Sequence, residues 1–145
     1  YDPYLDTLQI LKTNKESYLL LEPYSEEKEQ ESNWFGTYFP AGSWRLKWEE
    51  FPNSICYECE DTIEEVHIIK EFCKDFPAND QITIFWNNRC DPTLIMDLEI
   101  ALKYADSLIE DSGLSDLWFL NKTRKWCIEV YHGGELCTGY SPIQD

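Results

Sequence analysis

The order of hydrophobic and polar residues in the first third of the chain predicts three segments. An Asp-Pro start followed by hydrophobic residues at helical spacing predicts a helix over residues 2–13. A short apolar run predicts a strand at 17–22, which Pro23 ends. Residues 25–33 contain no hydrophobic side chain and predict an exposed acidic loop.

Aromatic residues and a glycine-containing turn in the next segment predict a β-hairpin. Residues 34–39 form its first arm, residues 40–43 the turn and residues 44–48 the second arm. In the second arm hydrophobic and basic side chains alternate, which is typical of a half-buried antiparallel strand. A further short strand is predicted at 55–60.

Two longer helices are predicted in the middle of the chain. A capping box that starts at Thr62 opens a helix over residues 62–76. Its apolar face is expected to contain Ile63, Val66, Ile69, Phe72, Cys73 and Phe76. Residues 81–86 are apolar on both faces and predict a central strand. A second Asp-Pro start predicts a long amphipathic helix over residues 91–109, which Gly113 ends.

The last part of the chain predicts three strands, at 117–120, 126–131 and 135–140, joined by polar and glycine-containing turns. Strands and helices do not alternate regularly. The fold expected is therefore α+β, with a largely antiparallel sheet and about three helices packed on one side. The length of 145 residues fits a single globular domain over residues 1–145.

The composition restricts the classes of partner. There are 12 Lys+Arg against 28 Asp+Glu, which gives a net charge of −16 and a pI near 4.3. Phosphate binding needs clustered basic residues, so direct nucleic acid binding is excluded and anionic membranes are disfavoured. The content of 43% hydrophobic residues is too high for a disordered acidic protein. No signal peptide or membrane span is predicted, and a chain that begins at Tyr1 is expected to lack its native first residues.

The six cysteines offer one motif with a known chemistry, Cys56-x-x-Cys59. With His67 and Cys73 it could supply zinc ligands, but these two residues lie about 120° apart around a helix. The acids around the motif would raise a thiol pKa, which disfavours a redox pair. The sequence therefore predicts free structural thiols, with no metal and no cofactor.

Catalysis has little support in the sequence. His132 and Cys137 lie close enough along the chain to form a nucleophilic pair, but His-Gly-Gly is also an ordinary hairpin turn. No nucleotide-binding, hydrolase, metalloprotease or calcium-binding motif occurs. The prediction is a protein that is not an enzyme, with a small Cys/His enzyme or a zinc-binding domain as the less favoured alternatives.

The acidic residues are concentrated in one part of the chain. Residues 49–80 contain ten acids and two lysines, and no basic residue occurs between 49 and 66. An acidic field with aromatic anchors suits a binder of basic protein surfaces. The predicted partner-binding residues are Glu49, Glu50, Phe51, Tyr57, Glu58, Glu60, Asp61, Glu64 and Glu65. The competing acidic patch is the predicted loop at 26–31, which lacks aromatic residues.

In size, charge and element order, this acidic, aromatic-rich chain resembles the bacterial immunity proteins that neutralise toxin domains. These include the partners of contact-dependent growth inhibition toxins and of nuclease bacteriocins. The resemblance implies a cytoplasmic protein that binds one cognate toxin tightly, with acidic side chains placed where nucleic acid phosphates would sit. The alternative among binding proteins is a phage-type nucleic acid mimic or anti-defence protein.

Overall fold

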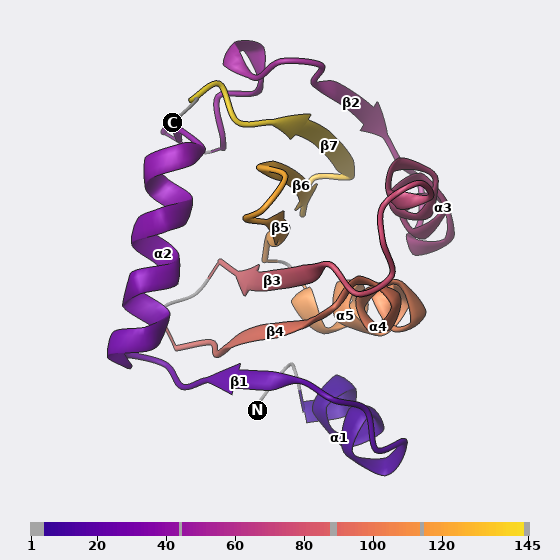
Figure 1. Ribbon diagram of the computed structural model, residues 1–145. Helices are drawn as coiled ribbons and strands as arrows, with labels where there is room; N and C mark the ends of the chain where they lie inside the picture. Colours follow the sequence, from indigo (N-terminus) through magenta and orange to yellow (C-terminus); the bar gives the residue numbers. More distant parts are fainter. Residues whose placement is uncertain (1–4, 44, 88–89, 114, 144–145) are drawn as a thin grey trace.

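A seven-stranded antiparallel sheet forms the centre of the protein (Figure 1). The computed structural model describes residues 5–43, 45–87, 90–113 and 115–143. The strands, β1 to β7, are Leu19–Leu21, Ile55–Glu58, Gln81–Trp86, Thr93–Asp97, Leu117–Asn121, Trp126–Tyr131 and Glu135–Tyr140. Their order in the sheet is β1-β4-β3-β5-β6-β7-β2, so β1 and β2 lie at the two edges. The α+β class and the antiparallel sheet predicted from the sequence are confirmed.

Five α-helices and one 3₁₀ helix surround the sheet within the described residues. The helices α1 to α5 are Leu5–Thr13, Glu26–Tyr38, Thr62–Cys73, Leu98–Lys103 and Ala105–Ser112, and the 3₁₀ helix η1 is Trp48–Glu50. None of the described helices has the length and apolar character that crossing a bilayer requires.

Both faces of the sheet are covered, and β6 shows how the sequence allows this. Trp126, Ile128 and Val130 pack in the core that contains the side chains of α1, α3, α4 and α5. Cys127 and Glu129 point to the opposite face, because successive side chains of a strand alternate. That second face is covered by α2 and η1, and Figure 1 shows α2 across the sheet from α3, α4 and α5. The sequence predicted about three helices on one side of the sheet. In the structure α1, α3, α4 and α5 lie on one side and α2 lies on the other.

Much of the remaining order follows the sequence prediction. The helix in 2–13 is confirmed for its described part, and so are the strands predicted near 17–22, 55–60, 81–86 and after 116. Gly113 ends α5 with a φ of 58°, a conformation that glycine adopts without the strain of a Cβ. The N-cap of α3 is Asp61, one residue before the Thr62 that the sequence predicted.

The predicted acidic loop at 25–33 is wrong, because these residues form most of α2. Ser25 caps the helix, its hydroxyl accepting a hydrogen bond from the Lys28 amide at 3.1 Å. Glu26, Glu27 and Glu29 occupy the first turn, where the helix dipole favours negative charge. No residue of α2 is buried, and its first half has no apolar stripe. Hydrophobic periodicity therefore could not predict this part of the helix.

The predicted hairpin at 34–48 is also wrong. Its first arm is the end of α2, and only one isolated bridge, between Ala41 and Leu46, remains of the expected pairing. Trp44 lies outside the described residues. Trp48 starts η1 and is buried, with its indole directed at Glu129. The described aromatic residues of this segment pack on the sheet rather than extend it.

The predicted long helix at 91–109 is wrong in its first part, where β4 runs from Thr93 to Asp97. This strand pairs with β1 on one side and β3 on the other, so sheet pairing on both edges overrides the helical spacing. Asp91 is buried and is not a helix cap. The helical part divides into α4 and α5 at Tyr104, whose amide bonds the Ile100 carbonyl at 3.1 Å.

Candidate partner-binding surface

Helix capping fixes the acids between β2 and α3. The Asp61 carboxylate accepts a hydrogen bond from the Glu64 amide at 2.9 Å. The Glu64 carboxylate accepts one from the amide of Glu60, the residue before the N-cap, at 3.0 Å, an arrangement similar to a capping box. The sequence predicted such a box one residue later. Because the cap holds the backbone, the acids of this turn have defined positions on the surface.

The β6–β7 hairpin adds another acid beside this turn. Glu58 in β2 lies directly opposite Glu135 in β7, and the Cys59 amide bonds the Gly134 carbonyl at 2.8 Å. Like charges opposite one another destabilise a strand pair, and Arg45 offsets this by forming an ion pair with Glu135. We call the resulting group the acidic surface: Glu58, Glu60, Asp61, Glu64, Glu65 and Glu135.

Two hollows lie within the acidic surface. The larger, about 570 Å³, lies among Arg45, the β6–β7 turn and the acids Glu58, Glu60, Glu64 and Glu135. The smaller, about 290 Å³, lies toward the end of α5 and is lined by Asp61 and Glu65, among others. Residues of the β6–β7 turn border both hollows. The surface therefore combines negative charge with a concave shape that can receive protruding side chains.

Burial and the neighbouring carboxylates raise the pKa of two groups at the acidic surface. Burial and the carboxylates of Glu65, Glu64 and Asp61 raise the pKa of the Cys59 thiol to about 11. This agrees with the sequence-based argument that neighbouring acids disfavour a reactive thiolate. Burial and the Asp61 carboxylate also raise the pKa of Glu65 above its ordinary value of 4.5. The charged form of Glu65 is therefore unfavourable in the folded protein.

We expect a Glu65→Gln variant to be more stable than the wild type at neutral pH, by about 1–2 °C in Tm after screening by solvent. A carboxyl whose pKa is raised on folding stabilises the protein below its unfolded value and loses that contribution as the pH rises through the folded pKa. The gain should therefore disappear below the ordinary value of 4.5. Thermal unfolding across this pH range measures it, with Glu60→Gln as the control for loss of one charge; an equal gain in the control contradicts the assignment.

Ile63 is the functional candidate that the sequence analysis placed wrongly. It was expected on the buried face of the helix, but its side chain is 80% exposed, the most exposed large hydrophobic side chain of the described residues. It stands in the first turn of α3 between Asp61 and Glu64. An apolar side chain surrounded by charged ones is a common arrangement in protein interfaces. Its spacing from Val66 and Ile69 along the helix predicted a buried position, so the sequence did not indicate this exposure.

The other predicted binding residues are divided between two places and the core. Glu49 and Glu50 are exposed in η1, which precedes the start of β2, whereas the acidic surface lies at the other end of β2, where α3 begins (Figure 1). Phe51 is only 4% exposed and packs on Trp48, so its role as a partner anchor is wrong. Tyr57 is half-buried against the core. The predicted patch is thus two separate acidic groups without an aromatic anchor from Phe51.

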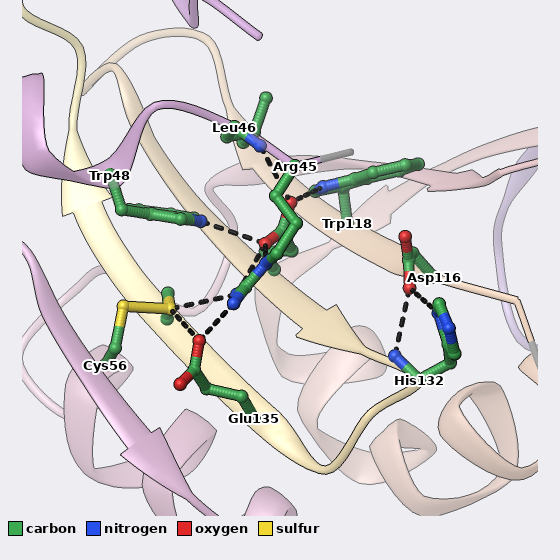
Figure 2. Close-up of polar contacts among 10 residues, drawn as sticks. Arg45, Leu46, Trp48, Cys56, Asp116, Trp118, His132 and Glu135 are labelled. Atoms are coloured by element: carbon green, nitrogen blue, oxygen red, sulfur yellow. Dashed lines mark hydrogen bonds and ion pairs between the residues drawn. A yellow bond between two sulfur atoms is a disulfide. The ribbon is translucent and has the colours of Figure 1, made fainter. Parts of the chain in front are cut away.

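A buried carboxylate on the α2-covered face of the sheet holds Arg45 beside the acidic surface. Glu129 is 0% exposed, and one of its oxygens accepts hydrogen bonds from Arg45 Nε at 2.8 Å and Trp48 Nε1 at 2.9 Å. Its other oxygen accepts from Trp118 Nε1 at 2.9 Å. Figure 2 shows the two indoles approaching from opposite sides, with Arg45 between them and reaching toward Glu135. The only sign of this cluster in the sequence is a single acid in an otherwise apolar strand.

The cysteines correct a second sequence prediction. Cys56 and Cys137 form a disulfide, so the prediction of free thiols is wrong for this pair. The cause is the register of β2 and β7, which places the two residues opposite one another although 81 positions separate them. Cys59, Cys73, Cys90 and Cys127 are not in disulfides.

The disulfide and the strand register bear on the alternative chemistries. Within the described residues, one group of potential metal ligands lies close together, Cys56, Glu135 and Cys137, and its two sulfurs are bonded to each other. This is not the Cys56, Cys59, His67 and Cys73 set considered from the sequence. A cysteine binds zinc as a thiolate, which a disulfide does not provide.

The proposed Cys–His pair is not assembled. The Cys137 sulfur is in the disulfide, and His132 Nδ1 lies 2.7 Å from the buried Asp116 carboxylate. The same carboxylate accepts a hydrogen bond from the His132 amide at 2.9 Å, so it supports the turn of the hairpin (Figure 2). This geometry holds the turn between β6 and β7 and does not form the Cys137–His132 nucleophilic pair considered from the sequence.

No protein-family model matches this chain, and no curated protein does. The function is therefore argued from the geometry and charge of the site.

Proposed function

We propose that the protein is a non-catalytic inhibitor that neutralises a cognate toxin by binding a basic surface of it with the acidic surface described above. A nuclease is the target that this chemistry fits best, because its substrate-binding surface is basic. Carboxylates in the place of phosphates would occupy that surface and exclude the substrate. The observation that carries the proposal is the capped, concave group of acids at the start of α3, where Ile63 is exposed.

Long-range charge supports rapid binding. The net charge of −16 attracts a basic partner from a distance, and the acidic surface is one place where the field is concentrated. Such steering raises the association rate and suppresses binding of acidic proteins. The cost is self-repulsion; the Asp61 carboxylate, after burial, contributes to the raised pKa of Glu65. Acids that repel one another lower the stability of the free protein. A basic partner would neutralise this repulsion on binding, which gives the acids a functional reason.

Ile63 supports the specificity of binding. An exposed isoleucine on a helix cap adds apolar contact area without weakening the core of the protein. When a partner covers it, the surrounding carboxylates exclude water and form the charged rim of the contact. The hollow that contains Arg45 and Glu135 can receive a basic side chain of the partner beside it.

Co-expression with the polypeptide encoded next to its gene tests the function. We expect the neighbouring polypeptide to be toxic alone, and this protein to restore growth and to copurify with it. Inhibition of several unrelated nucleic acid enzymes by the purified protein would favour the nucleic acid mimic instead. Failure to bind or neutralise any neighbouring product, together with an activity of its own, would contradict the inhibitor proposal.

The cytoplasm is the compartment in which an inhibitor of an intracellular toxin would act. The sequence-based expectation of this location relied in part on reduced cysteines. The Cys56–Cys137 disulfide is more typical of an oxidising compartment, so the cysteines no longer support a cytoplasmic location. The proposed location rests on the proposed function alone.

A further inference from the structure

A large cleft in the described part of the chain lies between the first half of α2 and the sheet. It has a volume of about 790 Å³, within the range of sites that hold small molecules or peptide side chains. Its aromatic wall comes from Phe35, Phe85 and Trp118, while Trp86, which also borders the cleft, has its side chain in the core on the other face of the sheet. The three rings are already packed together, with Phe35 stacked on Phe85 at 5.2 Å between centroids, so the apolar wall is preformed.

The cleft stays open because α2 is attached to the sheet mainly by its second half. There Phe35 packs edge-to-face on Trp118 at 5.7 Å between ring centroids. The first half is polar, and it is held by the Lys28 ammonium, which donates to the Asp91 carbonyl, and by a 2.7 Å ion pair between Glu31 and Lys122. Polar contacts at the borders hold the helix over the sheet and leave the space between them unfilled.

Tyr24 adds an exposed aromatic ring to the lining of this cleft. Its side chain is 74% exposed, and its φ of 65° is a left-handed conformation that bulky residues rarely adopt. Such strain is found most often where a side chain has to be held in a functional position. The phenol is 3.1 Å from the Cys90 sulfur, a contact that fixes the ring outside the core.

The helix that borders the cleft is negatively charged. Glu26, Glu27 and Glu29 form its first turn, and Glu29 lines the cleft. The one basic residue among the described lining residues is Lys28, whose ammonium contacts the Asp91 carbonyl. An occupant with basic residues is therefore favoured over an acidic one.

We propose that this cleft is a second binding site, which takes a large apolar side chain flanked by lysine or arginine in a segment of a partner protein. The aromatic wall supplies the contact for the apolar side chain, and Glu29 with the acids of the same turn supplies the contact for the basic ones. The site goes beyond the proposed function, because it lies on the face of the sheet covered by α2 and not at the start of α3 (Figure 1).

Blocked tripeptides test this site directly. The probes are acetyl-Lys-Phe-Lys-amide and acetyl-Lys-Leu-Lys-amide, with Lys-Ala-Lys and Glu-Phe-Glu versions as controls. Each is titrated to millimolar concentration into the full ¹⁵N-labelled chain, and the amide and indole signals are followed by NMR. We expect saturable shifts at Phe85, Trp86, Asn87 and Trp118, and at least roughly tenfold weaker binding of the two controls.

Two variants on α2 distinguish the cleft from general attraction of cations. Ser32 lines the cleft and its neighbour Asn33 is exposed outside the lining, so Ser32→Trp should fill the space while Asn33→Trp should not. We expect Ser32→Trp to weaken the Lys-Phe-Lys peptide at least roughly tenfold and Asn33→Trp to leave it unchanged, with thermal unfolding confirming that both variants fold. Absence of shifts at the cleft, equal binding of the alanine probe, or unchanged binding by a folded Ser32→Trp variant would overturn the proposal. Shifts at the acidic surface alone would leave the proposed function intact and reject this site.

Discussion

A Glu129→Ala variant is expected to lose about 3–5 kcal/mol of unfolding free energy, a large part of the stability of a domain of this size. The carboxylate is 0% exposed and accepts bonds from Arg45 and from the indoles of Trp48 and Trp118. Its removal leaves a partly buried guanidinium and two indole N–H groups without their acceptor, and desolvated polar groups without partners are costly. Chemical denaturation at equilibrium measures the loss.

Two further variants test whether the loss of stability comes from the hydrogen-bonded Glu129 cluster or from the removal of any negative charge. Glu58→Ala removes an exposed carboxylate from β2 and should change stability by less than about 0.5 kcal/mol. Combining Glu129→Leu with Arg45→Met should recover part of the loss, because two apolar side chains replace a buried ion pair at little cost. Equal, small losses for Glu129→Ala and Glu58→Ala would contradict the role assigned to Glu129.

The second large effect is expected from the disulfide. A Cys56→Ala, Cys137→Ala double variant should be less stable by about 4 kcal/mol, because the bond joins residues 81 positions apart and constrains the unfolded chain strongly. The bond also fastens β2, an edge strand that pairs only with β7. Amide hydrogen exchange in β2 should therefore accelerate more than in β6.

Thiol titration checks the same bond independently. In denaturant without reductant, we expect only Cys59, Cys73, Cys90 and Cys127, which are not in a disulfide, to react, and the remaining two only after reduction. Cys59→Ala is the matched control, since it removes a nearby sulfur that is not in the disulfide and should cost about 1 kcal/mol or less. Reaction of all six thiols before reduction would show that the bond is absent.

The β6–β7 hairpin and the β3 strand could be predicted because their local signals agree with their tertiary environment. Apolar residues occupy both faces of β3 and β6, and both strands are covered on both sides in the folded protein. The turn at residues 132–134 lies where the glycines indicate it. Local pattern is sufficient where each residue is buried as its own chemistry suggests.

Prediction failed where distant partners decide the outcome. The helix α2 has no buried residue, so its packing could not be inferred from periodicity, and its capping serine was the one available sign. β4 has helical spacing but is fixed as a strand by β1 and β3, which come from elsewhere in the chain. Sheet pairing of this kind is invisible to local pattern.

The candidate site was predicted in part for the same reasons. Consecutive acids after β2 were evident from charge counting, and the helix cap holds them together as expected. Phe51 was misplaced because an aromatic residue next to acids looks the same whether it packs inward or outward. Glu135 joins the site only through the register of β7 with β2, which the sequence does not contain locally.

The central claim is that the acidic surface, rather than acidity in general, binds the partner. Association rates with the neutralised toxin test it most directly, using three pairs of changes that each raise the net charge by four: Glu58→Lys with Glu60→Lys, Glu49→Lys with Glu50→Lys, and Glu26→Lys with Glu27→Lys. All six glutamates are exposed, and the first pair leaves the Asp61–Glu64 cap in place. We predict that the first pair slows association about tenfold or more and reduces its dependence on salt, while each other pair changes it less than about threefold. Equal slowing by all three pairs, or a larger effect of the Glu26 and Glu27 pair, would contradict the account.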